Sequence, residues 1–384
     1  MRVEKGFNKY LIDLRRKFHK YPEISWKEYE TSKMIKKELE KMGLEFKACA
    51  STGVIVDING NIAGKRVLLR SDMDALELIE KNEFDFKSVN MGVMHACGHD
   101  AHIAMLLGAT KLLNDNREFI KGSVRIVFQP AEECGEGAEK MISEGVLDDV
   151  DGAFAIHIWS MLENGKISVD EGERMASPDI FKINIKGLGC HGSLPQEGKD
   201  ALVAGASMVM NLQTVISREI SPLEAGVVTI GKLRSGSKYN IIAEDAFLSG
   251  TVRAFNEEIR IKIKNSIERI IKATGEMYGV HVEMEYIFGP PPVVNDSKCS
   301  RIAEESVKKL FGNESLISMT KLTAGEDFSL FAEKVPSVLA FLGAKKEEAY
   351  PHHNPRFDIE ESNLEKGAKL YMQYAVDFLG KQSK

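Results

Sequence analysis

Short apolar runs recur along this chain and alternate with longer amphipathic segments. Five of the runs are rich in leucine or β-branched residues and predict β-strands: 53–58, 66–70, 123–129, 152–156 and 337–342. Apolar residues recur at helical spacing in 7–20 and 26–42, which predicts two helices. Strands that alternate with helices predict an α/β fold with a mostly parallel central sheet flanked by helices.

Acids and histidines follow most of these predicted strands. They are Asp72 and Asp74 after the second run, Glu132 and Glu133 after the third, His157 after the fourth and His353 soon after the fifth. Each alone has a simpler interpretation as a polar turn, a solvated pair or a core histidine. In a doubly wound sheet, however, the loops beyond the strands' carboxyl ends converge on one crevice. Together, these residues predict a single site.

The stretch MHACGHDAH at 94–102 is the densest cluster of chemistry in the sequence. It places one thiol, three imidazoles and a carboxylate in nine residues of a chain with 9 His and 5 Cys. Cys97 and His99 are typical metal ligands, and Gly98 lets the backbone fold so that both point at one ion. Asp100 is positioned to cap the helix that follows. The alternative is a buried structural cysteine beside a capped helix.

Composition excludes several classes of function. A net charge of -6 gives no basic face for nucleic acid. No apolar run approaches the roughly 20 residues of a membrane span, and the N-terminal segment lacks a signal-peptide pattern, so we expect a cytoplasmic protein. The five cysteines are odd in number and scattered, which predicts reduced thiols.

At 384 residues the chain is long enough for two domains. Between 179 and 290 strands of alternating polarity flank two helical segments, which predicts an inserted α+β domain with an antiparallel sheet. Residues 1–178 and 291–384 would then form one discontinuous catalytic domain. Pro178 and the proline run after Gly289 are the natural hinges.

Eight motifs, in this order, resemble those of the M20 metallopeptidases, and within them the amidohydrolase branch of aminoacylases, hippurate hydrolases and auxin-conjugate hydrolases. They are SDMDALEL, MHACGHDAH, FQPAEE, AIHIWS, GLGCHGSLP, SKYNIIAEDAFLSGTVRAF, AGEDFSLF and HHNPRFDIEE. The resemblance covers nearly the whole chain. It implies a metal-dependent amidohydrolase that converts N-acyl amino acids to a carboxylate and a free amino acid.

Carried over by position, the resemblance implies two divalent ions per chain, as Zn, Mn, Co or Ni. Their ligands would be Cys97 as the bridge, Glu133 and His353 for one ion, and His99 and His157 for the other. Glu132 would be the general base that takes a proton from the attacking water. Asp72 would orient the site rather than bind metal, and Asp74 would be the partner of a ligand imidazole.

The inserted domain would act as a lid and as the surface of a homodimer. In the family, residues at the positions of His191, Asn240 and Arg253 reach the substrate, His191 across the dimer interface. The chain departs from the family at Glu77, Gln196 and Ala201, where Pro, His and Pro are usual, and these departures affect the substrate pocket.

Three other functions remain open from the sequence. The first is a di- or aminopeptidase of the same family. The second uses Cys97 as a thiol nucleophile with His99, and the third is a non-catalytic, metal-bound binding protein that kept the fold. Chelation and thiol alkylation separate the first two chemistries, and any turnover excludes the third.

Overall fold

The computed structural model describes residues 4–380, and the chain divides into two compact units. Unit 1 consists of Met1–Arg174, Val294–Thr320 and Asp327–Lys384, and unit 2 of Met175–Val293 and Lys321–Glu326. Lys321–Glu326 joins unit 2 although no feature of the sequence separates it from its neighbours. None of the helices within residues 4–380 is long and apolar enough to cross a membrane.

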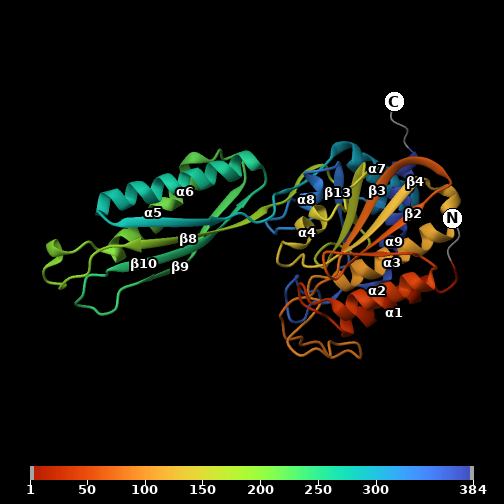
Figure 1. Cartoon of the computed structure of the whole chain (residues 1–384), viewed down its shortest axis with the longest axis horizontal. Helices are drawn as coiled ribbons and strands as arrows, with labels where there is room; N and C mark the ends of the chain where they lie inside the picture. The colour runs from red at the N-terminus through yellow and green to blue at the C-terminus, as the bar shows by residue number, and fades with distance from the viewer. Residues whose placement is uncertain (1–3, 381–384) are drawn as a thin grey trace. The chain divides into compact units, whose positions relative to one another are not determined.

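Unit 1 is built on a seven-stranded sheet of order β1-β2-β4-β3-β5-β13-β6 (Figure 1). The strands are β1 (Lys47–Cys49), β2 (Gly53–Asn59), β3 (Ile62–Asp72), β4 (Lys121–Gln129), β5 (Gly152–Trp159), β6 (Ile167–Ser168) and β13 (Ser337–Gly343). The four inner strands β4, β3, β5 and β13 run parallel to one another, whereas β1, β2 and β6 each pair antiparallel with the strand beside them.

The described sheet is therefore mixed rather than mostly parallel as predicted. A tight turn joins β1 to β2, and a connection that short permits only antiparallel pairing. The inner strands keep the predicted character: β13 is buried along its whole length, and β4 and β5 nearly so. Such continuous burial is typical of parallel strands that are covered on both faces.

Helices cover this sheet. The helices α1 (Phe7–Lys20), α3 (His99–Asp115) and α9 (Leu364–Gly380) pack on one another, and α3 and α9 lie on β3, β4 and β5. The first turn of α3 is buried along with most of the helix, because α1 and α9 cover it away from the sheet. The other helices of unit 1 are α2 (Tyr29–Lys41), α4 (Gly137–Ser143), α7 (Ser297–Phe311) and α8 (Ser329–Ala332).

The direction of the four parallel strands positions the site. β3 ends at Asp72, β4 at Gln129, β5 at Trp159 and β13 at Gly343. Because these strands are parallel, their carboxyl ends lie at the same edge of the sheet. The segments that carry the predicted acids and histidines therefore lie at one edge of the sheet.

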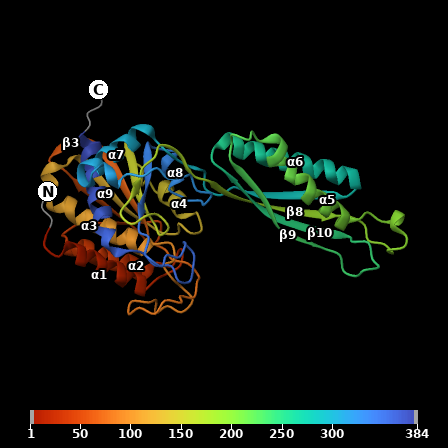
Figure 2. The same ribbon diagram turned by 180° about the vertical axis from the view of Figure 1, so that it is seen from behind.

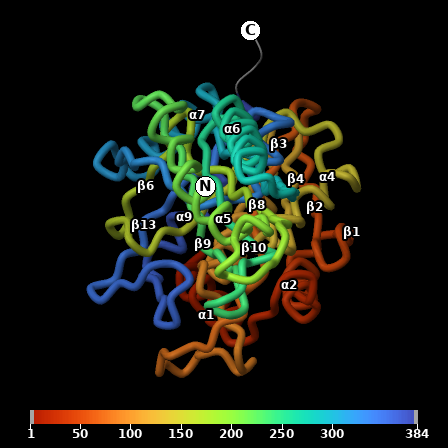
Figure 3. Tube along the Cα trace, turned by 90° about the vertical axis from the view of Figure 1, so that its left-hand side faces the viewer, coloured from red at the N-terminus to blue at the C-terminus, as the bar shows by residue number. Residues whose placement is uncertain are grey.

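Unit 2 has its own core and its own four-stranded antiparallel sheet, of order β11-β8-β10-β9. Figure 2 labels its strands β8, β9 and β10, and Figure 3 traces the backbone of the same chain. The strands are β8 (Ser177–Lys186), β9 (Gly226–Ser235), β10 (Asp245–Ala254) and β11 (His281–Ile287). Burial alternates along β8, so one face is covered, and the helices α5 (Ala201–Thr214) and α6 (Glu257–Tyr278) pack on each other and on β10. Two short strands, β7 (Gly172–Met175) and β12 (Val293–Asn295), form a separate ladder.

Candidate metal centre

The turn before α3 brings Cys97 and His99 to the end of the sheet. Gly98 adopts a φ of 93°, a left-handed conformation that favours glycine, and a Cβ there would lie 2.5 Å from Ile158 Cγ2. Gly98 is also the residue that precedes the helix, so the expectation that Asp100 caps it is wrong. Asp100 lies inside the first turn, where its buried carboxylate accepts hydrogen bonds from Arg15 at 2.9 Å and His19 at 2.8 Å.

His99 is held in one tautomer by the chain that follows β3. Its Nδ1–H donates to the backbone carbonyl oxygen of Asp74 at 2.9 Å, and one Asp74 carboxylate oxygen lies 3.3 Å from the same nitrogen. The opposite nitrogen, Nε2, is buried and has no hydrogen-bond partner among the described residues. An imidazole oriented in this way directs Nε2, rather than Nδ1, toward whatever lies in front of the ring.

His157 is fixed in the same manner by its own strand. Its Nδ1–H donates to the carbonyl oxygen of Ile158 at 2.7 Å, which directs Nε2 toward Cys97 Sγ at 3.6 Å. Burial, first, and the neighbouring imidazoles His102 and His352 hold the pKa of His157 well below its usual value. His157 is therefore neutral, the form that binds metal.

Glu133 and His353 meet on the other side of Cys97. His353 Nε2 lies 3.6 Å from Glu133 Oε2, and the backbone N–H of His353 donates to the Ala96 carbonyl oxygen at 2.8 Å. Both segments have unusual backbone conformations, because Ala131 has a φ of 57° and His353 a φ of 62°. Such strain is common where the surrounding structure fixes a functional side chain.

These side chains form two groups that share one sulfur atom. Cys97, His99 and His157 make one group and Cys97, Glu133 and His353 the other, with potential ligand atoms within 4.8 Å of one another in each. All five residues predicted as ligands are therefore brought together. Glu132, the predicted base, lies next to them, with Oε2 3.8 Å from His99 Nε2.

The electrostatics of this region favour a cation. Burial would lower the pKa of His99, but Asp72, Asp74 and Glu133 raise it to about 10. Burial raises the pKa of Glu133, His99 lowers it, and Asp74 and Asp72 raise it further. Glu133 Oε1, like His99 Nε2, is buried without a hydrogen-bond partner in the described chain. Two buried polar atoms without partners, among several carboxylates, are what a bound cation would satisfy, since the cation would take the place of the His99 proton.

A buried ion-pair network lies beneath the site. The Arg70 guanidinium donates to Asp72 at 2.8 Å, to Asp327 at 2.8 Å and to Gln129 at 2.9 Å, and all four side chains are buried. Sequence reasoning assigned no role to Arg70 or Gln129, because nothing local marks them as partners of Asp327. The network fixes Asp72, whose other oxygen accepts a hydrogen bond from His102 Nδ1–H at 2.6 Å.

The three remaining predicted site residues belong to unit 2. The turn that carries His191 pairs with the segment around Asn240, because Gly192 N–H donates to the Asn240 carbonyl oxygen at 2.8 Å. His191 Nδ1 lies 2.7 Å from Ser193 Oγ, and the ring is exposed. Arg253 is half-buried on β10, where it donates to the Val252 carbonyl oxygen at 3.0 Å.

Residues 68–377 match the model of Peptidase family M20/M25/M40. The chain belongs to this family. It is therefore a metal-dependent hydrolase, and the predicted resemblance to the amidohydrolase branch is confirmed by its relatives. An N-acetyl-L-cysteine deacetylase of Bacillus subtilis is 37% identical over 372 residues, which cover 97% of this chain and 88% of the deacetylase.

Two further relatives of this M20 chain broaden the comparison. Thermostable carboxypeptidase 1 of Saccharolobus solfataricus is 39% identical over 380 residues, covering 97% of this chain and 96% of that one. The crystal structure of a Bacillus subtilis protein described as a dinuclear metal binding peptidase from the M20 family superposes with a TM-score of 0.88. It is 34% identical, with 98% and 99% of the two chains covered.

At one position where this M20 chain departs from the family resemblance, the backbone N–H is used in a hydrogen bond. The backbone N–H of Ala201, at the start of α5, donates to the Ala243 carbonyl oxygen at 3.0 Å. Proline, which the family usually has at this position, has no N–H and could not make that bond. Gln196 lies nearby in a single 3-10 turn, and Glu77 lies in the loop after β3.

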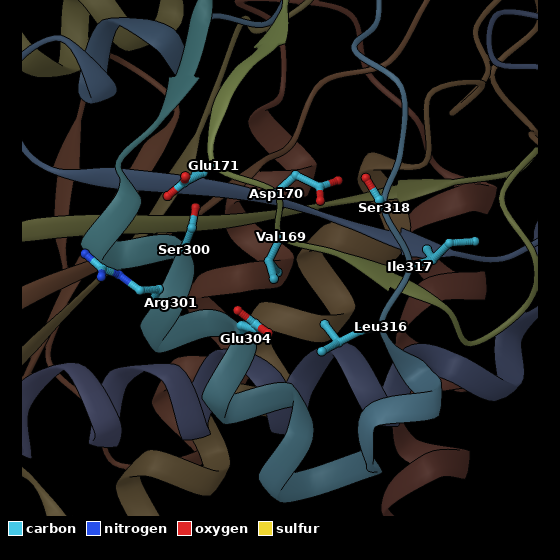
Figure 4. A pocket seen from close by; sticks show the side chains of 9 residues that line it. All are labelled: Val169, Asp170, Glu171, Ser300, Arg301, Glu304, Leu316, Ile317 and Ser318. Atoms are coloured by element: carbon cyan, nitrogen blue, oxygen red, sulfur yellow. The ribbon is translucent and has the colours of Figure 1, made fainter.

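A hollow of about 320 Å³ in unit 1 is separate from this chemistry (Figure 4). None of the predicted site residues lines it. Its acids include Asp170, which is already bound to Arg174 at 3.0 Å and to the Met319 backbone N–H at 2.8 Å. The Ser300 hydroxyl oxygen has no partner among the described residues, but it is shielded from solvent. We assign the hollow no part in the reaction.

Proposed function

We propose that this chain is an amidohydrolase that cleaves N-acyl amino acids, with an acetyl, benzoyl or similar acyl group, into a carboxylate and a free amino acid. The observation that carries the proposal is the pair of side-chain groups that share the Cys97 thiol, with Glu132 beside them. The deacetylase relative supports the substrate class.

The residues present fit two divalent ions. Cys97, Glu133 and His353 would hold one ion, and Cys97, His99 and His157 the other. Zn, Mn, Co and Ni all suit a set of one thiolate, three imidazoles and one carboxylate. Ions held there would supply Lewis acidity toward the amide carbonyl and would make water a stronger acid. The two orphaned atoms, His99 Nε2 and Glu133 Oε1, support this fit.

Glu132 is the proposed proton carrier. It would accept a proton from the water that attacks the amide carbon and deliver that proton to the departing amine nitrogen. Its position supports this role, because a Glu132 carboxylate oxygen lies within 4.8 Å of potential ligand atoms of His99 and Glu133, one from each group that shares Cys97. Asp74 would hold the His99 ring through its carbonyl oxygen, which fixes the nitrogen that faces the site.

Unit 2 would bind the substrate and join two chains. Arg253 and Asn240 would hold the substrate carboxylate, since a guanidinium offers two parallel donors to a carboxylate. His191 would donate to the oxygen that becomes negative as the carbonyl is attacked. We propose that this His191 comes from the partner chain of a homodimer, so that unit 2 acts as a lid for both sites.

Peptide cleavage is the second candidate, favoured by the 39% identity with a thermostable carboxypeptidase. A panel of N-acetyl amino acids, N-benzoyl amino acids and dipeptides, assayed with Zn, Mn, Co and Ni in turn, decides between the two. Faster turnover of the N-acyl substrates supports the proposal, and faster turnover of dipeptides replaces it with a peptidase.

Chelation and alkylation test the chemistry itself. The metal-loaded protein should lose activity with EDTA, regain it when metal is added, and keep it after treatment with a thiol alkylating reagent. Activity that survives EDTA but not alkylation would instead identify Cys97 as the nucleophile. A chain that binds metal but turns over none of the panel would point to a binding protein.

A further inference from the structure

The backbone N–H and carbonyl groups of Ile158 form hydrogen bonds with histidines from three different parts of unit 1. Its N–H donates to His102 Nε2 at 2.8 Å. Its carbonyl oxygen accepts from His157 Nδ1–H at 2.7 Å and from His352 Nε2–H at 3.1 Å. One backbone residue thus links helix α3, strand β5 and the loop that follows β13.

The end of β3 explains why side chains are needed here. β3 pairs with β5 only as far as Ala155, so the last residues of β5 have no strand on that side. Buried backbone N–H and C=O groups must still be paired. Ile156 N–H donates to the Tyr371 hydroxyl oxygen at 2.9 Å, and the N–H and carbonyl groups of Ile158 are paired with His102 and His352.

His102 is fully committed to this role. Its Nδ1–H donates to Asp72 and its Nε2 accepts from Ile158, so both ring nitrogens are used. Asp72, His99 and His102 are close enough to form a third candidate metal group, but His102 has no electron pair left to offer. It lies between the two other imidazoles, with ring centroids 5.4 Å from His99 and 4.7 Å from His157.

His352 contacts the carbonyl group of Ile158, whereas His102 contacts its N–H. Its ring stacks on Trp159 with centroids 4.3 Å apart, and its Nδ1 lies 3.5 Å from Ser160 Oγ, the weaker of its two polar contacts. His353 follows directly in the chain. The hydrogen bond from His352 to Ile158 therefore ties the backbone of His353 to the residue next to His157.

We propose that His102 and His352 are positioning residues. Through their hydrogen bonds to the backbone of Ile158, they keep the imidazoles of His99, His157 and His353 in place relative to one another. The inference rests on the proposed function, because it assumes that these three imidazoles bind metal. It assigns a role to two histidines that are not among the proposed metal ligands. Removal of a hydrogen bond that orients ligands typically weakens metal binding about 10–100-fold.

The test compares two substitutions at one position. His352→Phe keeps a ring that can stack on Trp159 but removes the donor, whereas His352→Gln offers an amide N–H in place of Nε2–H. Metal affinity is measured by titrating the metal-free protein with Zn²⁺ against a competing chelator dye. We expect His352→Phe to bind about 10–100-fold more weakly and His352→Gln to recover most of the loss.

His95→Phe is the matched control. His95 is also a histidine of this region, is buried and lies in the same motif as Cys97, but neither ring nitrogen has a hydrogen-bond partner among the described residues. The His95→Phe variant should therefore bind Zn²⁺ with the affinity of the wild type. Thermal melting of each metal-free variant separates weakened binding from a misfolded chain. Equal affinity of His352→Phe and wild type would overturn the inference.

Two further outcomes are distinct. A wild-type chain that takes up no metal refutes the proposed function itself, whereas metal uptake that His352→Phe leaves unchanged refutes only the positioning role. If His352→Phe does not fold, selective ¹⁵N-histidine labelling of the wild type gives the answer. The inference requires His352 as the Nε2–H tautomer and His102 as the Nδ1–H tautomer, and the opposite tautomers would contradict it.

Discussion

Glu132 and Glu133 show how neighbouring residues of one type acquire different surroundings. The Glu133 backbone N–H donates to an Asp74 carboxylate oxygen at 3.0 Å, and the left-handed φ of Ala131 turns the chain just before the pair. Glu133 then lies within a group with Cys97 and His353, and Glu132 does not join it. The two carboxylates are therefore suited to different tasks.

Glu132→Gln should separate these tasks. The amide cannot take a proton from water, so turnover should fall by about 10²–10⁴-fold while metal content stays at the wild-type level. Glu133→Gln, the matched change, should lose metal instead. Activity assays and elemental analysis of both variants provide the check, and loss of metal from Glu132→Gln alone would show that the assignments are reversed.

At the scale of elements, the start of α3 depends on one glycine with no space around it. Gly98 and Gly92 both have positive φ, at 93° and 83°, but a Cβ on Gly92 would meet nothing within 4 Å. A side chain at either position would therefore force a left-handed backbone conformation, and the two positions differ in how crowded they are.

Gly92→Ala should destabilise the fold by about 1–2 kcal/mol, the cost of a left-handed conformation. Gly98→Ala should cost about 1–3 kcal/mol more, because its Cβ would overlap Ile158 Cγ2. Urea unfolding of the two metal-free variants measures the difference. Equal destabilisation would mean that Ile158 moves aside freely.

The pair Asp57–Arg125 joins β2 to β4 and gives a pH-dependent contribution to stability. Burial raises the pKa of Asp57, but the two hydrogen bonds from Arg125, at 2.8 and 2.9 Å, lower it below its usual 3.8 overall. A depressed carboxyl pKa stabilises the fold above the unfolded pKa, and that stability is lost as the pH falls through the folded value.

Asp57→Asn should therefore lower the free energy of unfolding at pH 6, by no more than about 1 kcal/mol because the pair is partly exposed. The difference from wild type should shrink at pH 3, because this pH lies below the usual pKa of 3.8 at which the Asp57 carboxylate of the unfolded chain takes up a proton. Urea unfolding at both pH values tests this, and a difference that grows on acidification would contradict it.

Much of the site could be predicted because strand ends are local signals. The run before His157 and the double glutamate after β4 are legible in the sequence, and the parallel inner strands bring them together. The antiparallel edges of the sheet were not predicted, since pairing direction depends on partners distant in sequence. The hydrogen bonds of His102 and His352 were missed for the same reason: they meet only at Ile158.

At the scale of the whole molecule, the chain leaves unit 1 after Arg174, returns at Val294 and contributes Lys321–Glu326 to unit 2 as well, so unit 2 is inserted into unit 1. Its described sheet ends in β9 on one side, a strand with exposed residues along most of its length. An edge strand of this kind can pair with a second copy of itself. This supports the proposed homodimer.

A mixing experiment tests whether His191 acts across that dimer. His191→Ala and Glu132→Gln chains, each inactive alone, are combined under conditions that allow subunit exchange. If His191 serves the partner's site, half of the random pairs contain one intact site, and activity should return toward about a quarter of the wild-type level. Confirmed exchange without recovered activity would show that each chain builds its site alone.

The sulfur atom of Cys97 belongs to both side-chain groups, whereas every other member of the two groups belongs to one. Both proposed ions would therefore depend on this one thiol, which oxidants can modify. Burial raises the pKa of Cys49 and of Cys299 to about 12, which makes these thiols poor targets for peroxide. Oxidation of Cys97 to the sulfinic acid would remove a ligand from both groups at once, and irreversibly.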